Sequence, residues 1–459
     1  MQCTVLVDFG STFTKAVVIE KERAEVLFST KHPSTVSSDA SRALAECLND
    51  IKDTLGEIVL NEAEIHASSS AAGGLRMAVI GLTERLSVSA GKNVAFGSGA
   101  KIVSVMAGRI TEEDVEKLSS LPLEMILFCG GYENGNSSVL MHNAKMLAVG
   151  TFVCPVIFGG NSAISKEIRK ILTVAGKECY VIPNIIPQVG KLETEQGEAI
   201  IRDLFMKRIT NMKGLSKVKN IVGENIIPTP KAVLDAGRLL SEGYGTQKGY
   251  GNLMIVDIGG ATTDIHSYAE HMAGKGARLI GAKEPYAKRT VEGDLGMRES
   301  SDALLKTKEI DEWIAKLNIK KESFSKSILK RVRDTGYLAD TDMEKNIDET
   351  IATYAAKTAA RRHAGYLEST IGKSNNKIQI GKNLTEVQIV IGTGGPIIYS
   401  KNPEAILKTV LNNNEETFLL PEKASFYIDS EYILYAAGII AQYDKKLAFH
   451  VMQNSLSLN

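Results

Sequence analysis

Short apolar runs, rich in valine and isoleucine, alternate along this chain with longer stretches in which apolar residues recur at helical spacing. This alternation is typical of α/β domains. The predicted strands are TVLVDFG, AVVIEKE, EIHASSS, EMILFCGG, SSVLMHN, CPVIFGG, NLMIVDIGG, TDIHSYA and VQIVIGTGG, and the predicted helices span 40–55, 164–175, 197–208, 231–242 and 433–442.

The segment 300–371 departs from this alternation. It is charged, it becomes alanine-rich toward its end (IATYAAKTAARRHAG), and it contains few strand signals. We therefore expect a helical subdomain inserted between strands.

One pattern occurs twice. Residues 5–20 read VLVDFGSTFTKAVVIE, an apolar run that ends in Asp8 and a glycine turn before a second apolar run begins. Residues 251–268, GNLMIVDIGGATTDIHSY, repeat the design around Asp257. Each stretch indicates a strand, a tight turn and a second strand. Two hairpins of one kind, far apart in the sequence, predict duplicated half-domains.

The hairpin tips carry residue types that suit a phosphate group and a divalent cation. Glycine lets backbone N–H groups approach an anion, and serine and threonine hydroxyls add donors. An aspartate before the turn suits hydrated Mg²⁺ or the orientation of a water. Aspartate and glycine also occur in hairpin turns for geometric reasons alone, so a single tip would leave both interpretations open. The recurrence favours a nucleotide site.

A third glycine-rich element lies at residues 387–398, VQIVIGTGGPII. It is a strand that runs into four residues suited to close backbone approach to a nucleoside and its α-phosphate. Alone, it would indicate no more than a strand-to-helix turn.

Length and charge narrow the class of protein. A chain of 459 residues exceeds what one hydrophobic core usually serves, so we expect two or three domains. Lys plus Arg and Asp plus Glu each total 54, which gives a formal net charge of zero. No long basic run with interleaved aromatic residues is present, so nucleic acid is not an expected partner.

Cysteine usage and apolar run length bear on the compartment. The five cysteines are scattered and odd in number, which favours reduced thiols in a cytoplasm over a disulfide framework. The sequence does not open with a basic segment followed by a long apolar one, and no run reaches the length of a membrane span. We expect a soluble, cytoplasmic protein with no membrane partner.

The glycine-rich elements resemble those of the actin/Hsp70/sugar-kinase superfamily of ATPases, which close a nucleotide between two lobes built from related halves. DFGSTFTK looks like the first phosphate loop, DIGGATTD like the second and IVIGTGG like the adenosine loop. PKAVLDAGRLL and YILYAAGIIAQY are similar to the two interlobe helices. The resemblance implies an α/β, actin/Hsp70-like two-lobed ATPase fold of duplicated half-domains, with an inserted helical subdomain.

The same resemblance implies a division of the chain. The first lobe would span 1–250 and hold phosphate loop 1, a middle α/β region at about 151–223 and interlobe helix 1. The second lobe would span 251–459 and hold phosphate loop 2, the helical insert at about 300–371, the adenosine loop and interlobe helix 2.

A narrower resemblance extends over almost the whole chain. The tracts SSAAGGLRM, FCGGYENGN, PVIFGGN, NIIPQVGKLETEQGEAIIRDLF and RTVEGDLGMR look like the MutL proteins encoded beside glutamate mutase. One departure is the sequence Glu133-Asn134-Gly135, where that family has Asp-Gly-Gly. The resemblance implies an ATP-dependent, chaperone-like factor that reactivates an adenosylcobalamin-dependent mutase, of the amino acid class, by opening it for release of damaged cobalamin.

The resemblance also implies the site residues, with ATP or ADP and Mg²⁺ as cofactors. Asp8 and Asp257 would face Mg²⁺ through water, and Asp264 would support them, which makes these three the candidate catalytic residues. The residues implied to hold the nucleotide are Gly10, Ser11, Thr12, Lys15, Gly259, Gly260, Thr262, Thr263, Gly392, Thr393, Gly394 and Gly395.

The roles of two groups of cationic residues remain open between alternatives. Lys15 either supplies positive charge near the phosphates or is solvated on an exposed strand. Arg361, Arg362 and His363 either reach the adenine or form a solvated helix face.

Other functions of the same superfamily remain in view. An ATP-driven electron donor of the 2-hydroxyacyl-CoA dehydratase activator type uses cysteines after the second phosphate loop for an iron–sulfur cluster, and this chain has none after Asp257. A small-molecule kinase would need a general base on the acceptor side, and a filament-forming relative would assemble with ATP. We expect a slow Mg-dependent ATPase, assign no metabolite-converting activity, and leave homo-oligomer formation open.

Overall fold

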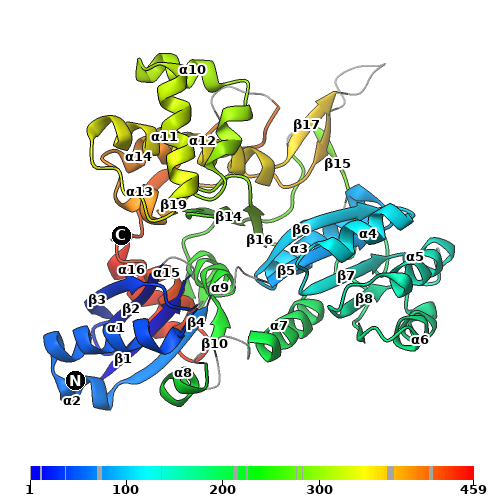
Figure 1. Cartoon of the computed structure of the whole chain (residues 1–459), viewed down its shortest axis with the longest axis horizontal. Coiled ribbons are helices and arrows are strands. Elements are labelled where there is room, and N and C mark those ends of the chain that lie inside the picture. Colours follow the sequence, from blue (N-terminus) through cyan, green and yellow to red (C-terminus); the bar gives the residue numbers. More distant parts are fainter. Residues whose placement is uncertain are drawn as a thin grey trace.

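The computed structural model describes residues 2–10, 13–36, 38–69, 75–135, 137–209, 215–223, 226–274, 276–281, 283–369, 377–412 and 417–458. Figure 1 shows a body built of the two chain ends, a mainly helical body above it, and a separate α/β body beside both. Ser11 and Thr12 lie outside the described residues.

The first hairpin belongs to a five-stranded sheet of order β10-β4-β1-β2-β3. Its strands are β1 (Cys3–Phe9), β2 (Phe13–Glu20), β3 (Glu25–Pro33), β4 (Glu64–Ser69) and β10 (Ile226–Pro228). The neighbours β1, β2 and β3 pair antiparallel, whereas β4 is parallel to β1 and β10 is parallel to β4.

The second hairpin belongs to a sheet of order β16-β14-β13-β19-β20. Its strands are β13 (Leu253–Ile258), β14 (Thr263–Tyr268), β16 (Ala287–Glu292), β19 (Ile389–Thr393) and β20 (Ser425–Ile428). Here β13, β14 and β16 pair antiparallel, and β19 and β20 add in parallel. Because order and direction match those of the first sheet, the predicted duplication of an α/β half-domain is confirmed.

The strand β1 is buried on both faces, which explains its uninterrupted apolar sequence. Val5 and Val7 pack in one core with Leu44 of helix α1 (Ala40–Leu55). Leu6 packs on the opposite face with the interlobe helices. The strand that leads to the hairpin tip is therefore packed between two cores.

A third five-stranded sheet forms the separate body, with the order β6-β5-β7-β8-β9 and every pair parallel. Its strands are β5 (Leu75–Gly81), β6 (Ala100–Ala107), β7 (Met125–Gly130), β8 (Val156–Gly160) and β9 (Cys179–Val181). Its helical segments are η1 (Glu84–Val88), α3 (Ser89–Gly97), α4 (Glu112–Ser120), α5 (Ser138–Val149), η2 (Ser162–Ile164), α6 (Ser165–Val174) and α7 (Glu195–Ile209).

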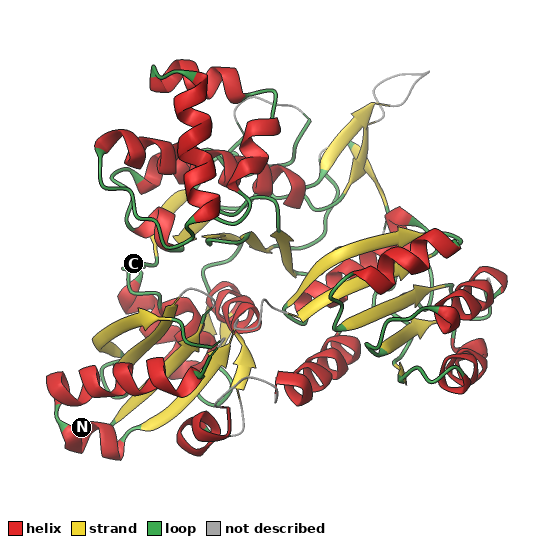
Figure 2. Cartoon of the chain, viewed as in Figure 1, coloured by secondary structure: helices red, strands yellow, loops and turns green. Residues whose placement is uncertain are grey.

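The expected helical subdomain is confirmed and appears as the group of red helices at the top of Figure 2. It comprises η3 (Ser301–Lys306), α10 (Ile310–Leu317), α11 (Lys321–Arg333) and α12 (Asp342–His363). A small sheet combines β15 (Ala277–Ile280), which precedes the subdomain in the chain, with β17 (Tyr366–Ser369) and β18 (Lys377–Ile380), which follow it. The further described elements are α2 (Glu57–Glu62), α8 (Leu215–Val222), β11 (Gly243–Tyr244), β12 (Gln247–Lys248), α13 (Gly395–Ile398) and α14 (Pro403–Lys408).

The two predicted interlobe helices cross in close contact. They are α9 (Thr229–Glu242) and α15 (Ile433–Ile440), and a Cβ on Gly438 would lie 1.9 Å from the carbonyl oxygen of Ala232. The Tyr435 hydroxyl of α15 donates to the Leu6 carbonyl of the first sheet at 3.1 Å. Similarly, the Tyr268 hydroxyl of the second sheet donates to the Leu234 carbonyl of α9 at 3.0 Å. Each helix is thus anchored to the other lobe.

The last helix, α16 (Lys445–Ser455), returns to the first lobe, where the Asn454 amide donates to the Ala24 carbonyl at 3.1 Å. Figure 1 shows it, in red, close to the blue strands.

Among the described residues, none of the helices combines the length and apolar character that a membrane crossing requires.

One predicted strand is wrong. SSVLMHN lies in α5 rather than in a strand. Its buried residues Leu140, Asn143, Ala144 and Leu147 recur at helical spacing, and the apolar run of three residues was too short to separate the two periods.

Candidate nucleotide site

The tips of both hairpins are closed by the same backbone hydrogen bond. The Gly10 N–H donates to the Phe13 carbonyl at 3.0 Å, and the Gly259 N–H donates to the Thr262 carbonyl at 2.8 Å. An aspartate occupies the same place before each turn, at Asp8 and Asp257. The local sequence therefore builds two equivalent tips.

Asp8 is buried where β1 ends. Its Oδ1 accepts hydrogen bonds from the Thr229 hydroxyl at 2.5 Å and from the Ser68 hydroxyl at 3.2 Å. Burial raises the pKa of Asp8, and the Lys15 ammonium and the two hydroxyls offset only part of that rise. Thr229 begins the first interlobe helix, so this hydrogen bond joins the first tip to the hinge.

Asp257 and Asp264 are directly opposite each other on β13 and β14. Burial, followed by the negative charge of Asp264, raises the pKa of Asp257 to about 7. Asp264 itself forms an ion pair with Arg289 through Oδ2, at 2.6 and 3.0 Å. Its Oδ1 is buried with no hydrogen-bond partner, which leaves an acceptor beside Asp257.

Lys15 lies on the β2 side of the first tip and is half-buried. Its ammonium sits 3.7 Å from the centroid of the Tyr432 ring. It lowers the pKa of Asp8 and of Asp257 against the larger effect of burial. The structure therefore places this positive charge between the lobes rather than in open solvent, which fits a role near phosphates.

The adenosine loop touches the second tip. Gly394 has φ +91°, and a Cβ there would lie 2.2 Å from the Ile258 carbonyl oxygen and 3.0 Å from the Asp257 Oδ1. Only glycine allows this approach. On either side of it, Gly392 packs against Ile397 and Leu407, and a Cβ on Gly395 would lie 3.7 Å from the Tyr432 hydroxyl.

Asp429 is a further candidate residue of this site, which the sequence pattern did not predict. It follows β20, accepts from the Thr393 hydroxyl at 3.0 Å and from the Ile433 N–H at 2.6 Å, and so joins the adenosine loop to α15. Burial raises its pKa to about 6. The signal was an aspartate after the apolar run SFYI, but no glycine turn marked it.

Two predicted residues of the second loop differ in what they face. The Thr263 hydroxyl is buried and donates to the Leu295 carbonyl at 2.6 Å, so it is directed into the protein. Thr262 is half-buried at the turn itself. The Gly259 and Gly260 carbonyls accept from the Met297 and Arg298 N–H groups at 3.1 and 2.8 Å. Residues 296–299 therefore support the loop from behind.

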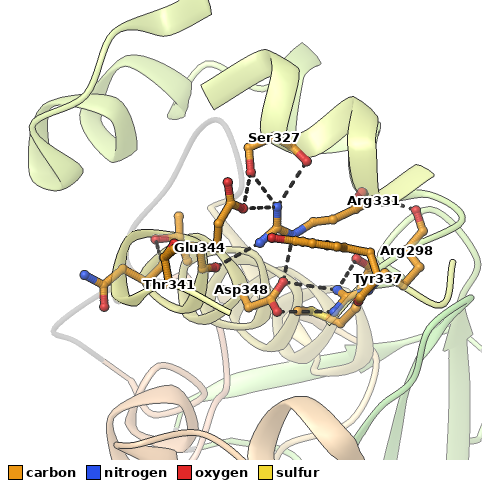
Figure 3. Close-up of polar contacts among 11 residues, drawn as sticks. Arg298, Ser327, Arg331, Tyr337, Thr341, Glu344 and Asp348 are labelled. Carbon is orange, nitrogen blue, oxygen red and sulfur yellow. Dashed lines mark hydrogen bonds and ion pairs between the residues drawn. The ribbon is translucent and has the colours of Figure 1, made fainter. Parts of the chain in front are cut away.

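Arg298 connects this support to the helical subdomain (Figure 3). Its guanidinium forms two hydrogen bonds with Asp348 of α12, at 3.1 and 3.2 Å. Asp348 also accepts from Arg331 of α11 at 2.8 Å, and Arg331 is fully buried and bonded to Glu344 at 2.7 Å. A continuous set of charged contacts therefore runs from phosphate loop 2 into α11 and α12.

The cationic residues late in α12 are engaged with other groups. Arg362 forms ion pairs with Asp294 and Glu292 at 2.7 and 2.8 Å. His363 is fully buried and bonded to Ser267 and Thr290. The guanidinium of Arg361 lies 5.4 Å from the centroid of the Phe418 ring. Neither adenine contact nor simple solvation describes His363.

The two lobes also meet at the rim of the site. The Lys31 ammonium of β3 donates to the Tyr399 hydroxyl, just after α13, at 2.6 Å.

Within the described part of the chain, no group of three or more histidine, cysteine, aspartate or glutamate residues has the geometry to hold a metal ion.

Comparison with known proteins gives a family and several distant structural similarities. The family model described as MutL protein matches residues 4–456. The Protein MutL of Clostridium tetanomorphum is 37% identical over 462 residues, which is 99% of either chain.

Two solved structures illustrate the distant similarities. A diol dehydratase-reactivating factor in nucleotide-free form is 10% identical, with 96% of this chain and all of that chain covered and a TM-score of 0.38. Component A of the (R)-2-hydroxyglutaryl-CoA dehydratase of Acidaminococcus fermentans is 10% identical, with 99% of each chain covered and a TM-score of 0.27. Scores this low assign no activity.

Proposed function

The chain belongs to the MutL protein family, and we propose that it is an ATP-binding, chaperone-like reactivating factor for an adenosylcobalamin-dependent mutase of the amino acid class. In this proposal, ATP binding and slow hydrolysis drive a change between two conformations. One of them opens the mutase so that damaged cobalamin leaves.

The observation that carries the nucleotide part is that one ammonium group acts on the aspartates of both hairpins, beside a glycine-rich third loop. Asp8 and Asp257 are both under the influence of the Lys15 ammonium, and Gly394 touches the second tip. Backbone N–H groups at such tips suit β- and γ-phosphates, and a lysine ammonium suits their charge. ATP or ADP is the ligand we assign to this site.

The carboxylates fit a magnesium ion. Asp8 and Asp257 are carboxylates whose pKa values are raised by burial, and a cation favours their charged form. The unpaired Oδ1 of Asp264 is a ready acceptor for a metal-bound water. Mg²⁺ keeps several waters in nucleotide sites, so we assign Asp8 and Asp257 to hold it through water, where it would neutralise phosphate charge.

The hinge and the arginine contacts support a conformational role. The interlobe helices α9 and α15 are each anchored to the other lobe, so closure of the site moves both. Phosphate loop 2 is joined to α11 and α12 through Arg298 and Asp348. A ligand shifts a protein between two states only by binding them differently, and these contacts give the nucleotide a means to do so.

Division, location and assembly follow the same proposal. We assign 1–250 to the first lobe and 251–459 to the second, with the insert at about 300–371. The middle α/β region expected at about 151–223 takes in only the later part of the separate α/β body, whose sheet begins with β5. All five cysteines are buried thiols, which fits the reducing cytoplasm that we assign. The partner is the mutase, and a homo-oligomer is compatible with these assignments.

Reconstitution tests the proposal. Mutase inactivated by turnover is mixed with fresh adenosylcobalamin, Mg-ATP and this protein, and activity is followed against Asp257→Ala. We expect recovery only with the unaltered protein and nucleotide. Equal recovery without the protein, for any mutase encoded nearby, would contradict the reactivating function.

Nucleotide binding is measured separately through the melting temperature. A ligand bound by the folded state alone stabilises it by an amount that grows with the logarithm of its concentration over Kd. If millimolar Mg-ATP changes neither the melting temperature nor the proteolysis pattern, the nucleotide site itself is wrong.

A further inference from the structure

The separate α/β body has a sheet order associated with ligand binding. Its five strands lie side by side in the order β6-β5-β7-β8-β9, and all are parallel. When the strands of this sheet are numbered along the chain from β5, this order is 2-1-3-4-5. This is the doubly wound order of flavodoxin-like domains. In such sheets the strand order reverses between the first and third strands, here β5 and β7, and ligands bind outside the carboxyl ends of the strands at that point.

A cavity lies at that place. Its volume is about 340 Å³, within the range of small-molecule sites. Leu82 and Thr83 follow β5, Gly108 follows β6, and Gly131 and Tyr132 follow β7, and all five line it. The carboxyl ends of the strands on both sides of the reversal therefore open into one hollow.

A buried hydroxyl fixes the loop that lines one side of the hollow. Ser87 accepts hydrogen bonds from the N–H groups of Leu82 and Thr83 at 2.7 and 2.9 Å. It donates to the Thr83 carbonyl at 3.3 Å. The start of the loop after β5 is thereby tied to Ser87, and all three residues line the hollow.

The rim is built from tracts that the nucleotide site does not use. Glu133 and Asn184 are bonded at 2.8 Å, and the Asn184 amide also donates to the Gly131 carbonyl at 2.9 Å. Asn161 accepts from the Asn134 N–H at 3.2 Å. These residues come from FCGGYENGN, PVIFGGN and NIIPQVG. Their convergence fixes the loops after β7, β8 and β9 around the hollow.

The chemistry of the lining indicates the ligand. Its walls are aliphatic apart from Tyr132, its polar groups are hydroxyls and glycine backbone, and the lining contains no charged side chain. A charged group would lose its hydration there without a partner, whereas a flat apolar ring would gain by burial and by contact with the tyrosine. From the position and lining of this hollow, we infer a second binding site, separate from the nucleotide site, for the uncharged aromatic ring of a small molecule.

Benzimidazole and indole are suitable probes, with cyclohexanol as a nonplanar control. Isothermal calorimetry and saturation-transfer NMR on the full chain should give a Kd in the millimolar range or tighter for the two aromatic probes. Cyclohexanol should bind at least about tenfold more weakly. Leu86→Trp should fill the hollow and weaken benzimidazole binding at least about tenfold. Leu338→Trp, at an exposed leucine of the helical subdomain, should leave it unchanged.

The outcomes separate this site from the nucleotide site. Asp257→Ala should bind benzimidazole as the unaltered protein does, and Leu86→Trp should keep its stabilisation by Mg-ATP, which also shows that it is folded. Absence of saturable binding by either aromatic probe would overturn the inference. So would equal binding by Leu86→Trp, or loss of benzimidazole binding on addition of ATP. Failure of the nucleotide site alone would leave benzimidazole binding intact.

Discussion

Asp257 and Asp264 are Cα partners across β13 and β14, whereas the corresponding partners of the first hairpin are Asp8 and Lys15. The duplicated halves therefore differ at one position in charge: the first tip pairs its aspartate with a cation, and the second pairs it with an anion. Burial raises the pKa of Asp257, and the like charge of Asp264 raises it further, to about 7.

Removing the charge of Asp257 should stabilise the ligand-free protein. The folded pKa is about 7, against 3.8 in the unfolded chain, so the contribution of this carboxyl to stability is greatest below about pH 3.8 and is lost as pH rises from there to about 7. Asp257→Asn should unfold at a higher denaturant concentration than the unaltered protein at about pH 8, and the difference should be smaller at about pH 5. Equal midpoints at both pH values would contradict the charge repulsion, and Mg-ATP should reverse the order by favouring the ionised carboxylate.

Thr229→Val should weaken the connection between the first tip and the hinge. The valine matches threonine in shape but removes the hydroxyl that donates to Asp8 at 2.5 Å. Loss of a hydrogen bond to a buried carboxylate costs about 1.5–3 kcal/mol. Thr229→Ser keeps the hydroxyl and is the matched control. Denaturant titration of both variants at neutral pH measures their free energies of unfolding. Identical free energies would show that the Thr229 hydroxyl does not contribute to stability.

Gly438→Val should separate the interlobe helices. A Cβ at this position would meet the Ala232 carbonyl oxygen at 1.9 Å, and backbone cannot yield as a flexible side chain can. Overpacking costs about 1–3 kcal/mol, and a backbone clash lies at or above the upper end. Gly336→Val, at an exposed glycine whose Cβ would meet only Asp334 Oδ1 at 3.4 Å, is the control. In thermal unfolding, the melting temperature of Gly438→Val should fall well below that of Gly336→Val. A similarly small fall in both variants would mean that α9 and α15 are not tightly packed.

Asp348→Ala should destabilise the helical subdomain and disconnect it from phosphate loop 2. Two arginines, Arg298 and the fully buried Arg331, would lose a shared carboxylate. Leaving a buried charge with no partner costs about 3–5 kcal/mol; Arg331 keeps its ion pair with Glu344, so we expect a loss below that range. Asp302→Ala removes an exposed partner of Lys306, where at most about 1 kcal/mol is at stake. Limited proteolysis with and without Mg-ATP should show that nucleotide no longer protects α11 and α12 in the first variant. Protection equal to that of the Asp302 variant would contradict the connection.

The sequence by itself determined the parts of this protein that depend on neighbours along the chain. Each hairpin tip is closed by a hydrogen bond across a four-residue turn, so aspartate, glycine and flanking apolar runs were enough to predict it. The helix at 40–55 was predicted to the residue because its buried positions recur at one period. Duplication followed from the repetition of the hairpin pattern, and the family from tracts spread over the chain.

Only the tertiary structure decided which distant residues complete the site. Thr229 reaches Asp8, Asp429 holds Thr393, and Arg298 reaches Asp348, each through contacts between elements far apart in the sequence. No local pattern encodes such contacts, because they depend on how sheets and helices pack. The same holds for the hollow beside β5 and β7, whose lining comes from several loops, and for α5, whose short apolar run fitted two periods until packing selected the helix.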